Sequence, residues 1–170
     1  MANPVYELDP VTHITADAVG TPGHRIFYIQ AERGLDRITL LTEKQQVEAL
    51  TEAIDEMVEN LEKEFGLTRH QELFVDEVLM SIKEPVEPLF RVGAMGLGYD
   101  ANRDRILLVA QEALGEEEEN RDPREVRLFA TRAQMQVLSV HARDVIARGR
   151  SPEQVTLQGE AHSRRNGHGE

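Results

Sequence analysis

The fold is decided by residues 24–66, which read HRIFYIQAERGLDRITLLTEKQQVEALTEAIDEMVENLEKEFG. The first two runs, residues 24–32 and 37–42, are rich in β-branched and aromatic residues, and a short reversal at Gly34 separates them. This pattern predicts two paired strands. Both runs are apolar at nearly every position, so we expect a sheet that helices cover on at least one face.

A long amphipathic helix is predicted directly after these strands, over residues 43–65. Apolar residues recur at helical spacing from Val47 onward, and the opposite face is acidic. The spacing Thr42-x-x-Gln45 is typical of a capping box, and Gly66 is a natural C-terminal stop. We therefore expect this helix to pack its single apolar stripe against the sheet.

The same order of elements returns in the second half of the chain. Residues 89–99, 104–113 and 125–130 read as strands, and an acidic loop precedes the last of them. Residues 131–148 read as a helix that begins with the box Thr131-x-x-Gln134. Shorter strands are expected at residues 4–8 and 11–18, whereas residues 70–87 fit either a short helix or a connecting strand.

The two halves also align residue by residue. Arg25-Ile26-Phe27-Tyr28-Ile29 matches Arg105-Ile106-Leu107-Leu108-Val109, and Ile38-Thr39-Leu40-Leu41 matches Val126-Arg127-Leu128-Phe129. The first match has a difference of 80 and the second a difference of 88, because the acidic loop lies between them. We predict one duplicated α+β domain over residues 1–150, with repeats at 11–66 and 89–149. Its antiparallel sheet would carry two helices, 43–65 and 131–148.

Composition excludes several classes of protein. The chain has 170 residues, a formal net charge of -12 and no cysteine, which rules out disulfides, thiolate zinc sites, iron–sulfur clusters and cysteine nucleophiles. No apolar run approaches the roughly 20 residues that a membrane span needs. The N-terminus MANPVYELDP lacks the basic and apolar regions of a signal peptide. We therefore expect a cytoplasmic protein with no membrane partner, and its acidity disfavours nucleic acid.

Three strings resemble a known family. They are GHRIFYIQA at 23–31, FRVGAMGLGYD at 90–100, and RRNGH at 164–168 after the closing helix. Together they resemble a bacterial domain-of-unknown-function family, number 3090, from Val11 to His168. The resemblance implies a conserved bacterial protein and brings no established activity with it.

The tail departs from that family. Its members usually end in a zinc-knuckle-like tail that starts Cys-Pro-x-Cys-Gly and finishes Gly-His-x-Cys-Pro-Arg. The corresponding residues 151–164 contain no cysteine, so tetrahedral thiolate zinc binding is chemically unavailable here. His162 and His168 without further ligands make a poor metal site. We expect no metal, and a polar, disordered tail over residues 151–170.

Four basic residues are candidates for binding an anion. His24 and Arg25 follow a Gly-Thr-Pro-Gly turn at the start of a strand, where they form either an anion-binding or acid–base pair or a solvated edge. Arg91 and Arg105 begin neighbouring strands. The three arginines would either converge on a phosphate or carboxylate or pair with carboxylates of the protein itself.

Two glutamines complete the candidate site. Gln30 and Gln111 lie late in matching strands, where they would bind a ligand or form a buried hydrogen-bond bridge between the halves. The glycines at 93, 96 and 98 do not form a phosphate loop, because no Lys-Ser/Thr follows them. They indicate a bulge or the close approach of another backbone or a ligand.

The sequence leaves three hypotheses about function. The first is a non-catalytic binding or adaptor protein that acts through protein–protein contacts, since no catalytic string is present. The alternative is a binder of, or an enzyme acting on, a small anionic or phosphorylated metabolite in a cleft between the repeats. The third is single-stranded nucleic-acid binding, which the acidic charge opposes. No cofactor is expected under any of them.

Overall fold

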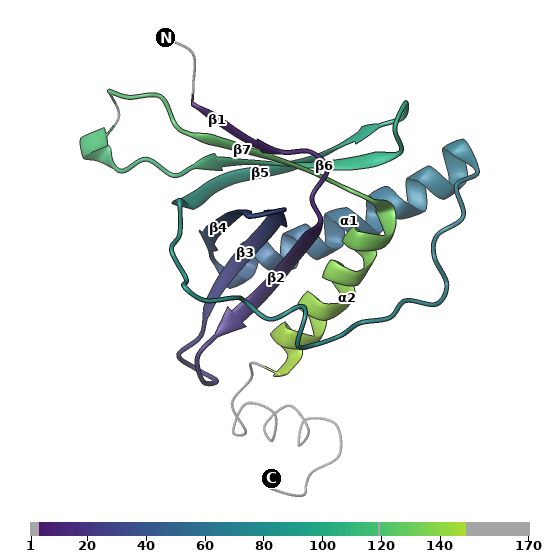
Figure 1. Cartoon of the computed structure of the whole chain (residues 1–170), viewed down its shortest axis with the longest axis horizontal. Coiled ribbons are helices and arrows are strands. Elements are labelled where there is room, and N and C mark those ends of the chain that lie inside the picture. The colour runs from purple at the N-terminus through teal and green to yellow at the C-terminus, as the bar shows by residue number, and fades with distance from the viewer. Residues whose placement is uncertain (1–3, 119, 149–170) are drawn as a thin grey trace, which may run out of the picture.

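The computed structural model describes residues 4–118 and 120–148, so the predicted tail over 151–170 lies outside the described residues. The described residues form strands and two long helices (Figure 1). In chain order they are β1 (Val5–Leu8), β2 (His13–Val19), β3 (Ile26–Arg33), β4 (Asp36–Thr42), α1 (Lys44–Phe65), β5 (Phe90–Asp100), β6 (Arg105–Glu112), the short 3-10 helix η1 (Glu116–Glu118), β7 (Glu125–Ala130) and α2 (Arg132–Arg148).

One seven-stranded sheet has the order β1-β7-β6-β5-β4-β3-β2. Strands β2, β3 and β4 are antiparallel, as are β5, β6 and β7. However, β4 pairs with β5 in parallel, and β1 pairs with β7 in parallel. The predicted α+β class is confirmed, but the purely antiparallel sheet was wrong. A helix and a long connection separate β4 from β5, which lets β5 run in the same direction as β4.

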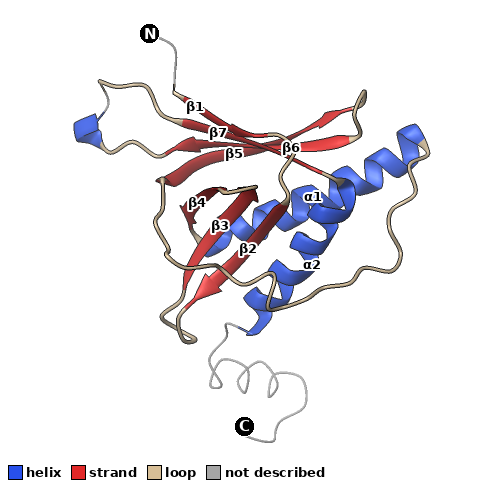
Figure 2. Cartoon of the chain, in the orientation of Figure 1, coloured by secondary structure: helices blue, strands red, loops and turns tan. Residues whose placement is uncertain are grey.

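Both helices lie in the angle between the two parts of the bent sheet (Figure 2). In that view the strands β1, β7, β6 and β5 cross above the helices, and β2, β3 and β4 lie to the left of α2. The predicted helices at 43–65 and 131–148 are confirmed within one residue at each end. Their apolar stripes meet the inner sheet face in one core, whose largest fully buried apolar side chains are Ile29, Leu40, Ile54, Ile106, Leu108, Leu128, Met135 and Leu138.

The first helix begins one residue later than the sequence predicts. The backbone N–H of Glu43 donates to Gln46 Oε1 at 2.8 Å, so the box uses this pair and not Thr42 and Gln45. The second box is confirmed, because the N–H of Thr131 donates to Gln134 Oε1 at 2.8 Å. Each box satisfies backbone donors that the first helical turn would otherwise leave unpaired.

The same two glutamines also tie the halves together. We define the first unit as β1–β4 with α1, and the second unit as β5–β7 with α2. Gln46 Nε2 donates to the carbonyl of Val92 in the second unit at 3.0 Å. Gln134 Nε2 donates to the carbonyl of Val11 in the first unit at 3.3 Å. Each helix start is therefore fixed to the leading strand segment of the other unit.

The register between the units differs from the sequence alignment. Leu40 of β4 and Leu128 of β7 hold matching positions, since each is buried beside its neighbouring strand. Ile29 pairs with Leu40, and Leu108 pairs with Leu128. The predicted difference of 80 for these strands is therefore one too large, and Arg25 and Arg105 do not hold matching positions. The duplication of the domain stays a prediction.

The connection from α1 to β5, residues 66–89, contains neither the helix nor the strand considered for it. It crosses the outer face of β2 and β3 (Figure 1) and bonds to their polar side chains. Thr15 Oγ1 donates to the carbonyl of Met80 at 2.6 Å. The fully buried Gln30 accepts from the N–H of Lys83 at 2.8 Å and donates back to its carbonyl at 3.1 Å. The connection thus covers the outer face of the first unit.

We expect Gln30→Ala to lower the free energy of unfolding by about 2–4 kcal/mol, because it opens a cavity and leaves two part-buried backbone groups of Lys83 without their partner. Urea denaturation of the full chain measures this change. Gln111→Ala is the matched control and should stay within about 0.5 kcal/mol, since Gln111 is exposed. Equal effects of the two substitutions would contradict this role of Gln30.

A buried carboxylate fixes the loop between β6 and β7. The Glu112 side chain is 6% exposed, and Arg121 and Arg124 each donate two hydrogen bonds to it at 2.8–3.1 Å. These bonds, led by those from Arg121, hold the pKa of Glu112 far below its usual range despite the opposing effect of burial. The ionised form of Glu112 therefore stabilises the native state.

The depressed pKa of Glu112 predicts a specific dependence of stability on pH. Its contribution is complete above the pKa of the unfolded chain, near 4.5, and is lost as the pH falls toward the lower pKa of the native state. We expect the unfolding free energy of the native sequence to fall more steeply below about pH 5 than that of Glu112→Gln. Parallel slopes in urea titrations of the two proteins would disprove the assignment.

Candidate functional site

Two of the predicted site residues lie together. His24 is exposed in the turn before β3, and Arg25 follows it, half-buried. The Arg25 guanidinium donates to the carbonyl of Val145 in α2 at 2.6 Å and stacks 5.1 Å from the centroid of the Phe27 ring. Arg25 therefore lies where β3 and α2 meet.

The three arginines do not converge. Arg91 pairs with Leu41 at the start of β5, and Arg105 pairs with Asp100 at its end. Nine residues of extended strand separate the two positions, or about 30 Å. Arg105 Nη1 donates to backbone carbonyls of its own hairpin, the nearer one at 2.9 Å. The structure therefore does not assemble a ligand site from Arg25, Arg91 and Arg105.

The two glutamines are not equivalent either. Gln30 is buried, and its Nε2 donates to Thr39 Oγ1 at 3.0 Å in addition to its bonds with Lys83. Gln111 is exposed, and its Nε2 donates to Glu125 Oε1 at 3.3 Å. Neither glutamine bridges the two units. Gln30 instead joins the sheet to the connection that crosses it.

One side of β5 lacks a neighbouring strand along most of its length. β4 pairs with β5 only at Phe90 and Arg91, so β6 is the single neighbouring strand from Val92 onward. A bulge follows Val92, and residues 94–100 then continue as a regular ladder with β6. The residues at 92–99, VGAMGLGY, carry no charge and no proline. Charges, prolines and coverings are the usual means of blocking such an edge.

An apolar groove runs beside this edge. We name the groove between α1 and the free edge of β5 the β5–α1 groove. It consists of two adjoining hollows of about 260 and 500 Å³, which share Ala53 and Leu97. Small side chains on α1 leave the space open, because Ala49 and Ala53 face β5 there. The main apolar lining is Ala49, Ala53 and Met57 from α1 with Met95, Leu97 and Tyr99 from β5.

The corresponding place in the first unit is closed. There β2, one edge strand of the sheet, has α2 packed along it, whereas α1 touches β5 at few positions. His141 of α2 is buried, and its Nε2 lies 3.0 Å from Asp17 Oδ1 of β2. Of the two matching edges, those of β2 and β5, the described residues cover that of β2 with a helix and leave that of β5 open.

The end of the groove near Phe65 and Tyr99 is aromatic, and a hydrogen bond holds Tyr99 in place. Phe65 is 57% exposed, and its ring centroid lies 6.1 Å from that of Tyr99. The Tyr99 hydroxyl donates to Asp104 Oδ1 at 2.7 Å, and Arg132 of α2 donates to the same carboxylate. Burial, followed by the bond to Asp104, raises the pKa of the Tyr99 hydroxyl. Tyr99 therefore stays a neutral donor at neutral pH.

The rim of the groove is acidic. Glu56 and Glu64 line it from α1, and neither carboxylate forms a salt bridge within residues 4–118 and 120–148. The net charge of -12 adds to the negative potential around these two groups. An apolar floor with an acidic rim fits a partner that has apolar side chains and basic flanks.

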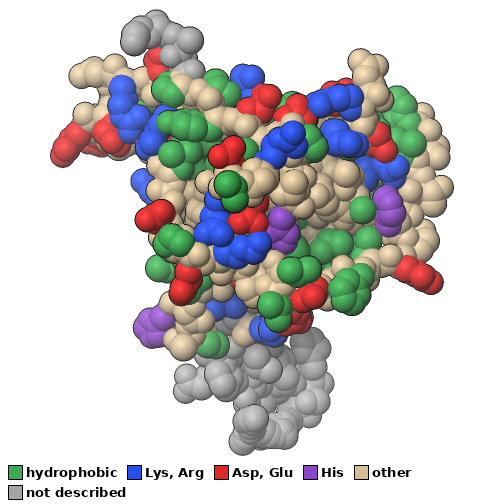
Figure 3. Space-filling view, viewed as in Figure 1, with side chains coloured by type: hydrophobic (Ala, Val, Ile, Leu, Met, Phe, Trp, Pro, Cys, Tyr) green, Lys and Arg blue, Asp and Glu red, His purple; other side chains and the backbone are tan. Residues whose placement is uncertain are grey.

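The described part of the chain contains no group of three or more His, Cys, Asp or Glu side chains placed to hold a metal ion. None of its helices is long and apolar enough to cross a membrane. On the face in Figure 3, basic and acidic side chains are interspersed and leave no continuous basic patch for a phosphate backbone.

The groove was not predicted from the sequence, although one signal pointed to it. The glycines at 93, 96 and 98 indicated close approach by another backbone, and Gly93 and Gly96 line the groove. Gly93 lies against the backbone of Ala113, where an added Cβ would come within 3.0 Å of its Cα. An added Cβ at Gly96 would meet nothing within 4 Å and would lie in open space.

The comparisons with known proteins identify a family and no activity. The model of a family described as "Protein of unknown function (DUF3090)" matches residues 6–157, most of the chain. The resemblance found in the sequence is thereby confirmed. No curated protein and no solved structure matches the chain.

Hydrogen–deuterium exchange of the full chain tests whether the β5 edge is open. We expect the amides of residues 94–100 that point away from β6 to exchange as fast as those of a solvated loop, while the central amides of β6 stay protected. Slow exchange that weakens on dilution would show a second copy on the edge. If exchange is slow and Leu157→Asp makes it fast, residues of the chain's own tail cover the β5 edge. Either result would contradict an open edge.

Proposed function

We propose, from the premise that this chain belongs to the DUF3090 family of proteins of unknown function, that it is a non-catalytic binding protein. It captures an extended segment of a partner protein, which adds as a strand to the free edge of β5. The observation that carries the proposal is the uncharged edge at 92–99, which no element of the described residues covers, beside an apolar groove. Strand addition to an open sheet edge is a recurrent mode of peptide recognition.

The dimensions and chemistry of the groove describe the partner segment. A strand beside residues 94–100 would be about seven residues long and would exchange backbone hydrogen bonds with β5. Its alternate side chains would enter the space between Ala53 and Leu97, where small and aliphatic side chains fit. The other side chains would face solvent. Backbone bonds supply affinity in this mode, and the groove supplies selectivity.

Charge selects the partner over a second copy of this chain. Two copies paired through β5 would bring the acidic rims at Glu56 and Glu64 together, and both proteins carry a net charge of -12. Like charges of this kind oppose association, whereas lysine or arginine at the ends of the bound segment would meet the rim favourably. The partner segment is therefore apolar in alternation and basic at its ends.

The same proposal places the protein in the bacterial cytoplasm. The sequence has no cysteine, which suits a reducing compartment. A partner there would present a basic, extended segment between or after its folded parts. Such segments bind through their backbone without a deep pocket, which suits a shallow groove.

Selection from a displayed library of random peptides on the full chain tests the proposal. Enriched peptides should alternate apolar and polar residues, carry Lys or Arg at their ends and lack central proline. Ala53→Arg should weaken binding of these peptides at least about tenfold, because it fills the groove with a bulky side chain. Fluorescence anisotropy with a labelled selected peptide measures the loss.

Glu52→Arg is the matched control. It introduces the same side chain one residue away on α1, outside the groove lining, and should leave affinity within about twofold. Enrichment of acidic or proline-rich peptides, no enrichment at all, or equal affinity in Ala53→Arg would each overturn the proposal. Circular dichroism of both variants confirms that the helices remain folded.

A further inference from the structure

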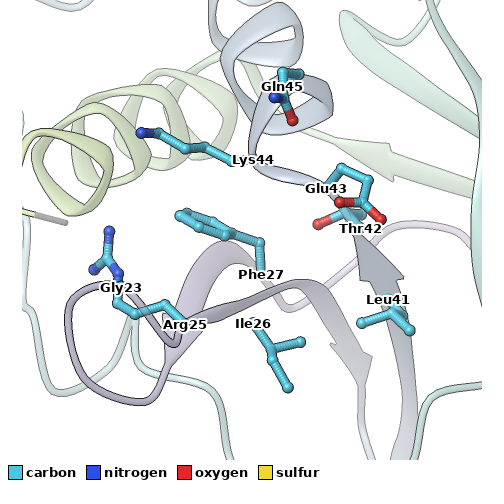
Figure 4. A pocket seen from close by; sticks show the side chains of 9 residues that line it. All are labelled: Gly23, Arg25, Ile26, Phe27, Leu41, Thr42, Glu43, Lys44 and Gln45. Atoms are coloured by element: carbon cyan, nitrogen blue, oxygen red, sulfur yellow. The ribbon is translucent and has the colours of Figure 1, made fainter. Parts of the chain in front are cut away.

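A second concave site lies at the start of α1, away from the β5–α1 groove. This pocket measures about 540 Å³ and shares no lining residue with the groove. Its lining comes from the turn before β3, the first residues of β3, the end of β4 and the first turn of α1 (Figure 4). We name it the α1 N-terminal pocket.

The pocket combines several donors that suit an anion. The backbone N–H groups of Lys44 and Gln45 open a helix of 22 residues and have no carbonyl within the helix to bond. Aligned peptide dipoles give such a helix start a partial positive charge. Lys44 and Arg25 add two full positive charges, and neither forms a salt bridge among the described residues.

A buried hydroxyl provides the independent indication of a ligand. Thr42 lines the pocket and is only 4% exposed, yet its Oγ1 has no hydrogen-bond partner among the described residues. A buried polar group without a partner destabilises the folded state, so proteins rarely retain one that nothing satisfies. A phosphate oxygen in the pocket would accept a hydrogen bond from this hydroxyl.

The side chains around the pocket define where the rest of a ligand would lie. In Figure 4 the Phe27 ring lies between Arg25 and Lys44, which both extend toward α2. Arg25 is held in place by its bond to Val145, and Nη2 is the atom that this bond uses, which leaves other guanidinium donors for a ligand. The Phe27 ring offers an apolar wall beside the charged groups.

Two carboxylates near the pocket oppose the binding of an anion. Glu43 lines the mouth of the pocket with an exposed carboxylate, and Asp17 acts on Arg25 from the neighbouring hollow. Burial, with Arg148 as a second cause, lowers the pKa of Arg25, although the guanidinium stays charged at neutral pH. Glu43 is solvated, so its repulsion is screened, and its removal should strengthen binding of an anion.

We propose that the α1 N-terminal pocket binds the phosphate group of a small phosphomonoester. The phosphate accepts hydrogen bonds from the first N–H groups of α1 and from Thr42 Oγ1, and it pairs with Lys44 and Arg25. The organic part of the ligand lies against Phe27. This site lies within the first unit, with α2 beside it, and differs from the cleft between repeats and from the three-arginine cluster that the sequence suggested.

Titration of the full, isotope-labelled chain with phenyl phosphate at constant ionic strength tests the site. The amide resonances of Lys44 and Gln45 should shift in a saturable manner, and inorganic phosphate should shift the same amides with weaker affinity. Benzoate and phenol should shift them far less, because neither carries a phosphate. Shifts spread over all surface lysines, or none at these two amides, would overturn the proposal.

Three variants locate the binding groups. Lys44→Gln should weaken phenyl phosphate about fivefold, Thr42→Val about threefold, and Glu43→Gln should strengthen it about twofold. Lys63→Gln removes the same charge from the other end of α1, where Lys63 pairs with Glu59, and should leave affinity unchanged. Equal weakening by Lys44→Gln and Lys63→Gln would show only a nonspecific charge effect and would end the proposal. Arg25 is left intact because it also supports α2.

Discussion

The short parallel junction between β4 and β5 is the constraint on which the rest of the molecule depends. It pairs Leu40 with Phe90 and Leu41 with Arg91, and it joins the two antiparallel parts into one sheet. Beyond this junction β4 leads into α1, whereas β5 continues toward its hairpin with β6 as its one paired strand. A longer junction would have placed a strand along the whole of β5. The open edge is therefore a direct consequence of how soon the two strands separate.

Because of that junction, helix α1 contributes to two separate sites. Its middle stands away from β5 through Ala49 and Ala53, which leaves the groove. Its first turn is held against the second unit by Gln46 and also forms one wall of the α1 N-terminal pocket. The first unit, in contrast, has its outer face crossed by the connection at Gln30 and its edge strand covered by α2. Similar elements in the two units thus end up with different exposure.

Much of the fold could be predicted from the sequence, because both helices and most strands follow apolar patterns, although the capping box of α1 lies one residue later than its spacing indicated. The register between the two units could not be predicted. Tyr28 and Leu107 face outward in strands that are apolar on both faces, so alternation does not distinguish a shift of 79 from one of 80. The parallel junction depends on where residues 66–89 lead the chain, and this segment has no periodic pattern. Arg91 and Arg105 are candidates because of their charge, whereas Ala49 and Ala53 matter for their small size, which sequence alone does not mark as functional.

An edge strand without charge or proline has a consequence for colloidal behaviour. Most proteins protect such a strand locally, but the residues at 92–99 have no such protection of their own, and the acidic surface as a whole keeps molecules apart. That protection is electrostatic, so it disappears near the isoelectric point of about 5.0 and is reduced in concentrated salt. Under those conditions the β5 edge that suits a partner segment can also pair with the β5 edge of another copy. We expect the protein then to form filaments or to precipitate. The net charge of the whole protein thus keeps this one strand from pairing with the same strand of another copy.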